Sequence, residues 1–201
     1  MRNQSGRSMV EMLGVLAIVG ILSVGGIAGY SKAMTKYNVN KLTDEFTLFL
    51  QNIQLNQSKL CKANSGPYTS ILTYLKALDL IPDKWKYKQG LPLYDSSGNR
   101  VSVYAANTEE IQLDYYLYPT AKNMNNALFC KEVWIKIIKP NAGMLQRIFI
   151  SRNSVIESRD YGENYCNHKN MKCISDATIS DIIARCKVCT KELCILTVAF
   201  K

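Results

Sequence analysis

The sequence has one histidine among its 201 residues, and it lacks the residue groupings on which most enzyme active sites depend. His168 lies in a polar stretch beside Asn167 and Lys169, where a solvated imidazole is the expected state. No serine or cysteine can be assigned to it as a nucleophile. The sequence also has no glycine-rich phosphate loop and no acidic cluster of metal-ligand density. These absences predict that the protein is not an enzyme and needs no cofactor or metal ion.

Formal charge is missing from one long stretch near the N-terminus. The segment 12–30 contains no Asp, Glu, Lys or Arg, and with Met9 and Val10 it approaches the ~20 residues that span a bilayer as a helix. Glu11 stands at its entrance, and a carboxylate inside a membrane span requires a cationic partner. An ordinary signal anchor with an incidental Glu is the alternative. A cleaved secretory signal is disfavoured because the apolar stretch is long and has no A-x-A site.

The residues around Glu11 resemble the leader and N-terminal helix of the type IV pilin and type II secretion pseudopilin superfamily. In that family a short basic leader ends in Gly, and a Glu lies five residues past the cut; here Arg2, Gly6 and Glu11 match. Two residues depart from the pattern: Arg7 replaces the usual Phe, and Ala28 replaces a common helix-kinking Pro. The resemblance covers about 30 of the 201 residues, and further matches are Ala17, Ile18, Gly20, Ile21, Leu22 and Tyr30.

The resemblance implies that a prepilin peptidase cuts between Gly6 and Arg7, and that the new N-terminus is a candidate for methylation. The mature chain would be held in the inner membrane with its head outside the cytoplasm. An assembly platform would then add it to a homo- or heteropolymer of pilin subunits, either an extracellular pilus or a periplasmic pseudopilus. Such filaments serve adhesion, motility, DNA uptake or secretion. Glu11 would pair with the α-amino group of a neighbouring subunit, and no small-molecule substrate is expected.

We expect four parts along the chain: a leader over 1–6, a transmembrane and assembly helix over 7–30, an amphipathic continuation of that helix over 31–62, and a head over 63–201. The continuation has apolar residues at three-to-five-residue steps, which is typical of a helix with one buried face. We expect this stripe to seat the head. Its members are Met34, Tyr37, Leu42, Phe46, Phe49, Ile53 and Leu60.

The head is predicted to combine an antiparallel sheet with short helices in an α+β fold stapled by disulfides, and its element order resembles that of type IVb pilin heads. Apolar and polar residues alternate over Ile111–Leu117, which indicates a half-buried strand. The other expected elements are a helix over Ser70–Leu80, a turn over Asp95–Asn99, extended structure from Val101, a helix through Met124, Leu128 and Trp134, a hairpin of Arg147–Ile150 with Val155–Glu157, a helix over Ser175–Arg185 capped by Ser175 or Asp176, and a last strand over Leu193–Phe200.

Seven cysteines are many for this length, and the export segment favours disulfides among them. Cys186-x-x-Cys189 leaves two alternatives open: a zinc site completed by Cys166 and Cys173, or a redox dithiol in a membrane-tethered exported domain. Zinc sites usually have two tight cysteine pairs, and redox motifs usually begin a helix, so structural disulfides are favoured.

Resemblance to type IVb heads implies a bond between Cys130 and Cys186. Short polar loops separate Cys166 from Cys173 and Cys189 from Cys194, and each loop is able to bring its two cysteines within bonding distance. Cys61 is then left as a free thiol, buried as a small apolar residue.

The formal net charge is +9, which permits binding of nucleic acid by a basic head. The lysines and arginines are scattered without a dense block, so a solvated basic surface is the favoured interpretation.

Overall fold

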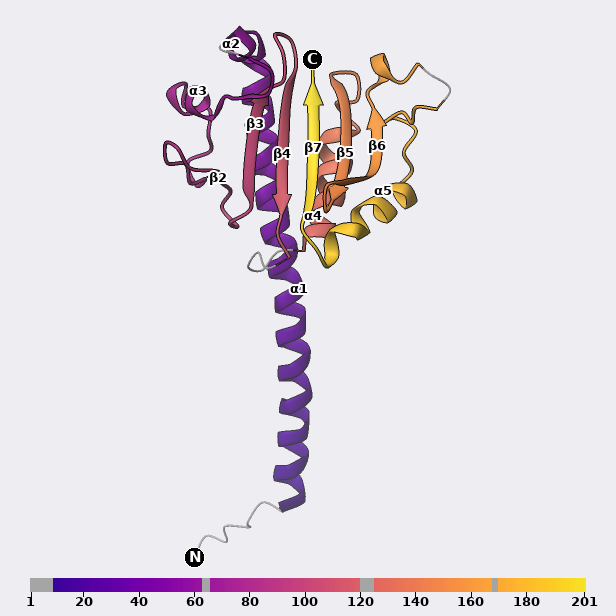
Figure 1. Ribbon diagram of the computed structural model, residues 1–201. Helices are drawn as coiled ribbons and strands as arrows, with labels where there is room; N and C mark the ends of the chain where they lie inside the picture. The colour runs from indigo at the N-terminus through magenta and orange to yellow at the C-terminus, as the bar shows by residue number, and fades with distance from the viewer. Residues whose placement is uncertain (1–8, 63–65, 120–124, 168–169) are drawn as a thin grey trace, which may run out of the picture. The chain divides into compact units, whose positions relative to one another are not determined.

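Helix α1 (Met9–Leu55) is the longest element of the computed structural model, which describes residues 9–62, 66–119, 125–167 and 170–201 (Figure 1). The chain divides into two units after Tyr37. Residues 9–37 of α1 belong to the first unit, and residues 38–55 belong to the second.

The long helix ends at Leu55, earlier than the sequence pattern predicts. Asn56 interrupts it, and a separate short helix α2 (Gln57–Lys62) follows. The Asn56 side chain donates a hydrogen bond from Nδ2 to the Asn52 carbonyl oxygen, 2.9 Å away. Asparagine competes for backbone groups in this way and is a poor residue for a helix interior. The expectation of one continuous helix to residue 62 was wrong for this reason.

Within the described residues of the second unit, seven strands form one antiparallel sheet (Figure 1). Their order is β1-β3-β4-β7-β5-β6, and β2 pairs with β3 outside this path. The strands are β1 (Thr69–Ser70), β2 (Leu93–Tyr94), β3 (Arg100–Ala105), β4 (Ile111–Leu117), β5 (Leu145–Arg152), β6 (Val155–Tyr161) and β7 (Cys194–Phe200).

The last strand lies in the middle of the sheet and joins its two halves. Val198 of β7 is in register with Leu113 of β4 on one side and with Ile148 of β5 on the other. The predicted strand over Ile111–Leu117 is confirmed, and the hairpin that was expected near residue 150 is confirmed with longer strands. The final strand begins one residue later than predicted.

Short helices complete the second unit. Part of the segment expected to be helical through Met124 and Trp134 lies outside the described residues. The rest forms α4 and a π-helix. The elements are α3 (Leu72–Ala77), α4 (Asn126–Val133), the π-helix η1 (Trp134–Ile138), the 3₁₀-helices η2 (Glu163–Tyr165) and η3 (Lys187–Thr190), and α5 (Ile179–Cys186).

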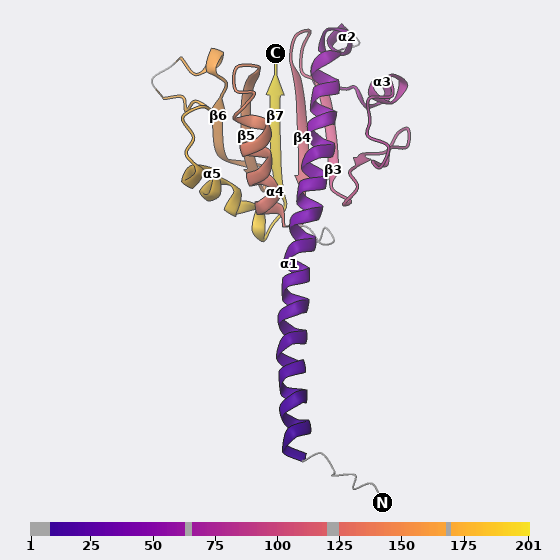
Figure 2. The same ribbon diagram turned by 180° about the vertical axis from the view of Figure 1, so that it is seen from behind.

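The second half of α1 and helix α4 cover the same face of the sheet, as Figure 2 shows. Phe46 of α1 is fully buried, and its ring centre lies 5.1 Å from that of Tyr115 on β4 and 6.2 Å from that of Phe129 on α4. The predicted helical stripe is therefore buried in the core from Leu42 onward. Its first two members, Met34 and Tyr37, belong to the first unit and are exposed, which corrects the expectation that they help to seat the head.

Helix α5 begins at a capping residue that the sequence analysis did not select. The Thr178 hydroxyl accepts a hydrogen bond from the Asp181 backbone N–H, and the Asp181 carboxylate accepts one from the Thr178 N–H. This reciprocal capping box satisfies two backbone donors at once. The choice of Ser175 or Asp176 as the cap was wrong because only Thr178 has an acidic residue three positions later at the start of this helix.

Candidate assembly helix and disulfide framework

Residues 12–30 of helix α1, which lie in the first unit, carry no formal charge. Among the side chains that the structure describes, the large apolar ones from Met12 to Tyr30 are 52–74% exposed. Helix α1 is long and apolar enough to span a membrane. A helix that is apolar all round is stable only where apolar material surrounds it, either lipid or other helices.

Glu11 lies in the first turn of α1, where the positive end of the helix dipole favours a carboxylate. Gly6 and Arg7, the residues on either side of the expected cleavage, lie outside the described residues. Gly25 and Gly29 are one helical turn apart, and a Cβ atom added at either would meet nothing within 4 Å in this chain. Small residues at this spacing allow the backbones of two membrane helices to approach closely.

The second unit contains three disulfides among its described cysteines. Cys130 of α4 is bonded to Cys186, the last residue of α5, with their Cα atoms 5.6 Å apart. Two local bonds close short loops; they join Cys166 to Cys173 and Cys189 to Cys194, with Cα separations of 5.3 and 5.0 Å. These are the pairs named from the resemblance and the loop lengths.

The bonds bear directly on the two alternatives for Cys186-x-x-Cys189. The two cysteines belong to different disulfides, so they do not form a redox pair with each other in this structure. Across residues 9–62, 66–119, 125–167 and 170–201, no group of three or more His, Cys, Asp or Glu side chains is arranged to hold a metal ion. The described geometry therefore offers no support to a zinc site or a dithiol centre here.

Cys61 is the free cysteine, and it is buried at the end of α2. It lines a cavity of about 550 Å³ beside Glu109 and Lys201, whose side chains form an ion pair of 2.6 Å. Burial, and then the Glu109 charge, raise the pKa of the Cys61 thiol. The thiolate is the reactive form of cysteine, so this thiol is a weak nucleophile at neutral pH.

The sequence analysis did not predict the buried ion pair between β6 and α5. Asp160 of β6 is fully buried, and its Oδ1 lies 2.8 Å from Nη2 of Arg185 on α5. Burial raises the pKa of Asp160 to about 6, although the charges of Arg185 and Lys172 act in the opposite direction. The sequence of β6, VIESRDY, does not alternate between apolar and polar residues, so it carries no signal that Asp160 is buried.

Comparison of the chain with models of known protein families, with curated proteins and with solved structures finds no match.

Proposed function

We propose that this chain is a structural subunit of a bacterial type IV pilus or type II secretion pseudopilus, assembled through the N-terminal part of α1. The observation that carries the proposal is the apolar surface of residues 12–30, which is exposed on all sides of the helix. A subunit of this kind places that surface in lipid before assembly. After assembly the same surface packs against the helices of neighbouring subunits.

Glu11 supplies the specificity of this packing. It is the single charged residue between Met9 and Ser31. After cleavage behind Gly6, the α-amino group of Arg7 on a neighbouring subunit is its partner. A wrong axial stagger leaves the buried carboxylate without this amine, and breaking a buried ion pair costs on the order of 3–5 kcal/mol. That difference is large enough to select one register of subunits.

The second unit is the head, which the export path delivers outside the cytoplasm. Its three disulfides suit an oxidising compartment such as the periplasm or the cell surface. The second half of α1 is part of the head's core through Leu42, Phe46 and Ile53. A continuous helix therefore belongs to both the assembly surface and the folded head.

Mass spectrometry of the protein taken from its native membrane tests the processing step. The mature chain should begin at Arg7, and replacing Gly6 by a bulky residue should leave the precursor uncut in the membrane. A native chain that retains residues 1–6, or one that is cut near Gly29, contradicts the proposal.

Filament yield tests the role of Glu11. Glu11→Ala should insert into the membrane and fold its head normally, because the head core contains no residue of the first unit. Its share in filaments sheared from cells, relative to total membrane protein, should fall sharply. Met12→Ala is the matched control, since it shortens a neighbouring side chain and keeps the charge. Equal incorporation of Glu11→Ala and wild type contradicts the pairing.

A further inference from the structure

One face of the sheet is left uncovered by the described helices. The second half of α1 and helix α4 lie on the other face, and Figure 1 shows the strands in front of them. Tyr115 of β4 packs against Phe46 of α1, so the next residue, Tyr116, points to the uncovered face. Paired residues of antiparallel strands place their side chains on the same face. The register therefore shows which residues lie beside Tyr116.

A row of alternating basic and aromatic side chains crosses part of this face. Arg100 of β3 is paired with Tyr116 of β4 on one side and with Tyr94 of β2 on the other. Tyr94 is in turn paired with Lys86 through an isolated bridge. We call these four residues, Lys86, Tyr94, Arg100 and Tyr116, the basic–aromatic row. Its ends are 30 positions apart in the sequence, so only the strand pairing brings the row together.

Backbone hydrogen bonds hold the exposed end of the row. The Lys86 N–H donates to the Tyr94 carbonyl oxygen at 2.7 Å, and the Tyr94 N–H donates to the Lys86 carbonyl oxygen at 3.0 Å. The turn that follows is held by Asp95, whose Oδ1 accepts hydrogen bonds from the N–H groups of Ser97 and Asn99. The Lys86 and Tyr94 side chains are exposed on this fixed backbone. A ligand would therefore meet a surface whose backbone is already ordered.

The cations of the row are available to a ligand. Among the described residues, neither Lys86 nor Arg100 has an acidic partner within 4 Å. The guanidinium carbon of Arg100 lies 4.8 Å from the centre of the Tyr116 ring. Lys84 and Lys88 flank Lys86 in the sequence, are exposed, and likewise have no such partner in the part of the chain that the structure describes.

Two acids near the row reduce its positive potential without cancelling it. Asp114, in the neighbouring row of the uncovered face, accepts hydrogen bonds from the Thr197 hydroxyl at 2.7 Å and the Gln112 amide at 3.1 Å. Its charge offsets part of the charge of Arg100. Asp83 is exposed just before the three lysines. Three lysines and one arginine against these two acids leave a net positive surface, which attracts anions.

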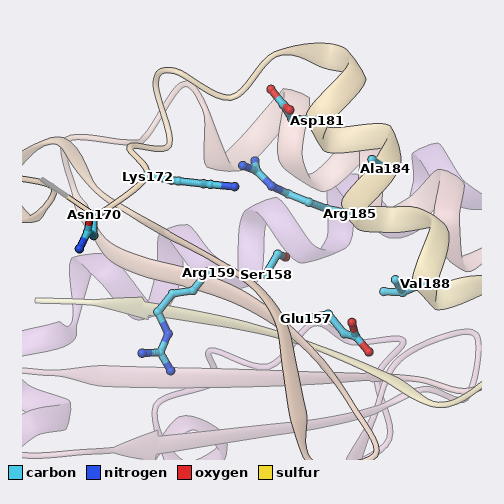
Figure 3. A pocket seen from close by; sticks show the side chains of 9 residues that line it. All are labelled: Glu157, Ser158, Arg159, Asn170, Lys172, Asp181, Ala184, Arg185 and Val188. Carbon is cyan, nitrogen blue, oxygen red and sulfur yellow. The ribbon is translucent and has the colours of Figure 1, made fainter.

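Another cluster of cations in the head has a different balance. Arg159, Lys172 and Arg185 line a cavity between β6 and α5 (Figure 3). The acids Glu157 and Asp181 line the same cavity. Opposite charges in one cavity offset each other, so the basic–aromatic row is the stronger candidate for an anionic partner.

The alternation of charge and ring matches the chemistry of a single-stranded nucleic acid. Such a strand carries an anionic phosphate between successive planar bases, and proteins bind it with cations near the phosphates and aromatic rings that stack on the bases. Neighbouring strands are about 4.8 Å apart, so the two tyrosines of the row are about 10 Å apart, and so are its two cations. A duplex keeps its bases stacked inside, and an acidic polypeptide has no bases, so neither would use the rings in this way.

We propose that the basic–aromatic row binds single-stranded nucleic acid, with its two tyrosines stacking on bases and its two cations contacting phosphates. The proposal does not depend on assembly of the chain into filaments.

Fluorescence anisotropy of a labelled oligothymidine of about 12 nucleotides, with the full chain in neutral detergent micelles, tests the proposal. The oligothymidine should bind saturably at low salt. The logarithm of its association constant should fall against the logarithm of the salt concentration with a slope of about −1.4 or steeper, as two phosphate contacts on a single strand require.

Two variants separate the charge from the ring. Lys86→Gln should weaken binding and reduce the size of the slope by about 0.7. Tyr94→Leu should weaken binding about tenfold and leave the slope unchanged, because it removes a stacking surface and no charge. Both side chains are exposed, so both variants should keep their fold, which the thermal unfolding midpoint checks.

Lys187→Gln and Tyr37→Leu are the matched controls. Both residues are exposed and lie outside the sheet, in η3 and in the first unit. Each control should bind oligothymidine within about twofold of wild type. Absence of saturable binding, a slope unchanged in Lys86→Gln, or equal losses in the controls overturns the proposal. Binding of polyglutamate as tight as that of oligothymidine, or tighter binding of a duplex of the same length, overturns the assignment of a single-stranded nucleic acid.

Discussion

Removing the disulfide between Cys130 and Cys186 should destabilise the second unit more than removing any other. This bond joins α4 to the end of α5 and spans 56 residues of sequence. A crosslink of this kind restricts the unfolded chain, and the restriction grows with the logarithm of the loop length. Both cysteines are buried, so their replacement by alanine also removes packing contacts in the core.

The loop lengths give the expected size of the effect. A loop of 56 residues corresponds to about 4 kcal/mol at 25 °C in the chain-entropy relation. The bond between Cys189 and Cys194 spans five residues and corresponds to about 2 kcal/mol in the same relation. These two cysteines are buried as completely as Cys130 and Cys186, so the short bond is a matched control for the loss of packing. The difference between the two double variants should therefore be about 2 kcal/mol.

Denaturant unfolding of the full chain in detergent, followed by near-UV circular dichroism, measures this difference. Cys130→Ala/Cys186→Ala should have the lower free energy of unfolding, and its thermal midpoint should lie about 4–8 °C below that of Cys189→Ala/Cys194→Ala for a unit of this size. Wild-type protein treated with a reductant provides the common reference. Equal losses in the two double variants would show that loop entropy does not set the contribution of these bonds.

Three further perturbations test the packing, the electrostatics and the capping of the head. Phe46→Ala should lower the free energy of unfolding by about 3–5 kcal/mol through loss of a buried aromatic side chain, whereas Tyr37→Ala, at an exposed position, should lower it by less than about 0.5 kcal/mol. The folded protein holds the Asp160 proton up to about pH 6, against 3.8 for an ordinary aspartate, so stability should rise by up to roughly 3 kcal/mol as the pH falls from 7 to 4. Asp160→Asn should abolish that part of the pH dependence, and an unchanged slope would contradict the assignment. Thr178→Ala should lower the free energy of unfolding by about 1 kcal/mol, whereas Ser175→Ala should have little effect. A larger loss in Ser175→Ala than in Thr178→Ala would support Ser175 as the cap of α5.

The parts of the fold that follow from periodicity were predictable from the sequence. Strict alternation over Ile111–Leu117 gives a strand with one buried face, and β4 has these bounds. The helical stripe identified the buried residues of α1 from Leu42 onward. Periodicity does not show where a helix leaves the core, because Met34 and Tyr37 fit the same stripe and are exposed. Periodicity also does not show where a side chain competes for backbone hydrogen bonds. The Asn56 side chain does so at the end of α1, where it donates to a backbone carbonyl oxygen.

The order of the strands in the sheet could not be predicted from the sequence. β7 is last in the chain and lies between β4 and β5, and only long-range pairing selects that place. The buried ion pair of Asp160 and Arg185 also joins residues that are distant in the sequence. Asp160 and Arg185 are 25 positions apart, and neither belongs to a motif that could be recognised along the chain. Their proximity follows from the docking of α5 near β6, which the bond between Cys130 and Cys186 helps to fix.

The two units of the chain differ in whether they bury their own apolar side chains. The second unit buries its large side chains within its own core. The first unit exposes about ten large apolar side chains between Met12 and Tyr30. Complete burial of such a side chain gains about 1.5–3 kcal/mol, and these side chains are 52–74% exposed, so covering all of them would gain on the order of 10–20 kcal/mol. That gain favours lipid or other helices around this part of α1 over water.

Lipid and neighbouring helices are nearly equal as apolar surroundings, so the hydrophobic effect alone does not move the first unit from one to the other. Within a membrane, helices associate through close packing and through polar contacts. Gly25 and Gly29 offer the close packing, because side-chain atoms are absent there. Glu11 offers the polar contact, and it is the only formal charge between Met9 and Ser31. We therefore expect the balance between membrane and filament to respond most strongly to Glu11, and to respond little to conservative changes among the surrounding apolar side chains.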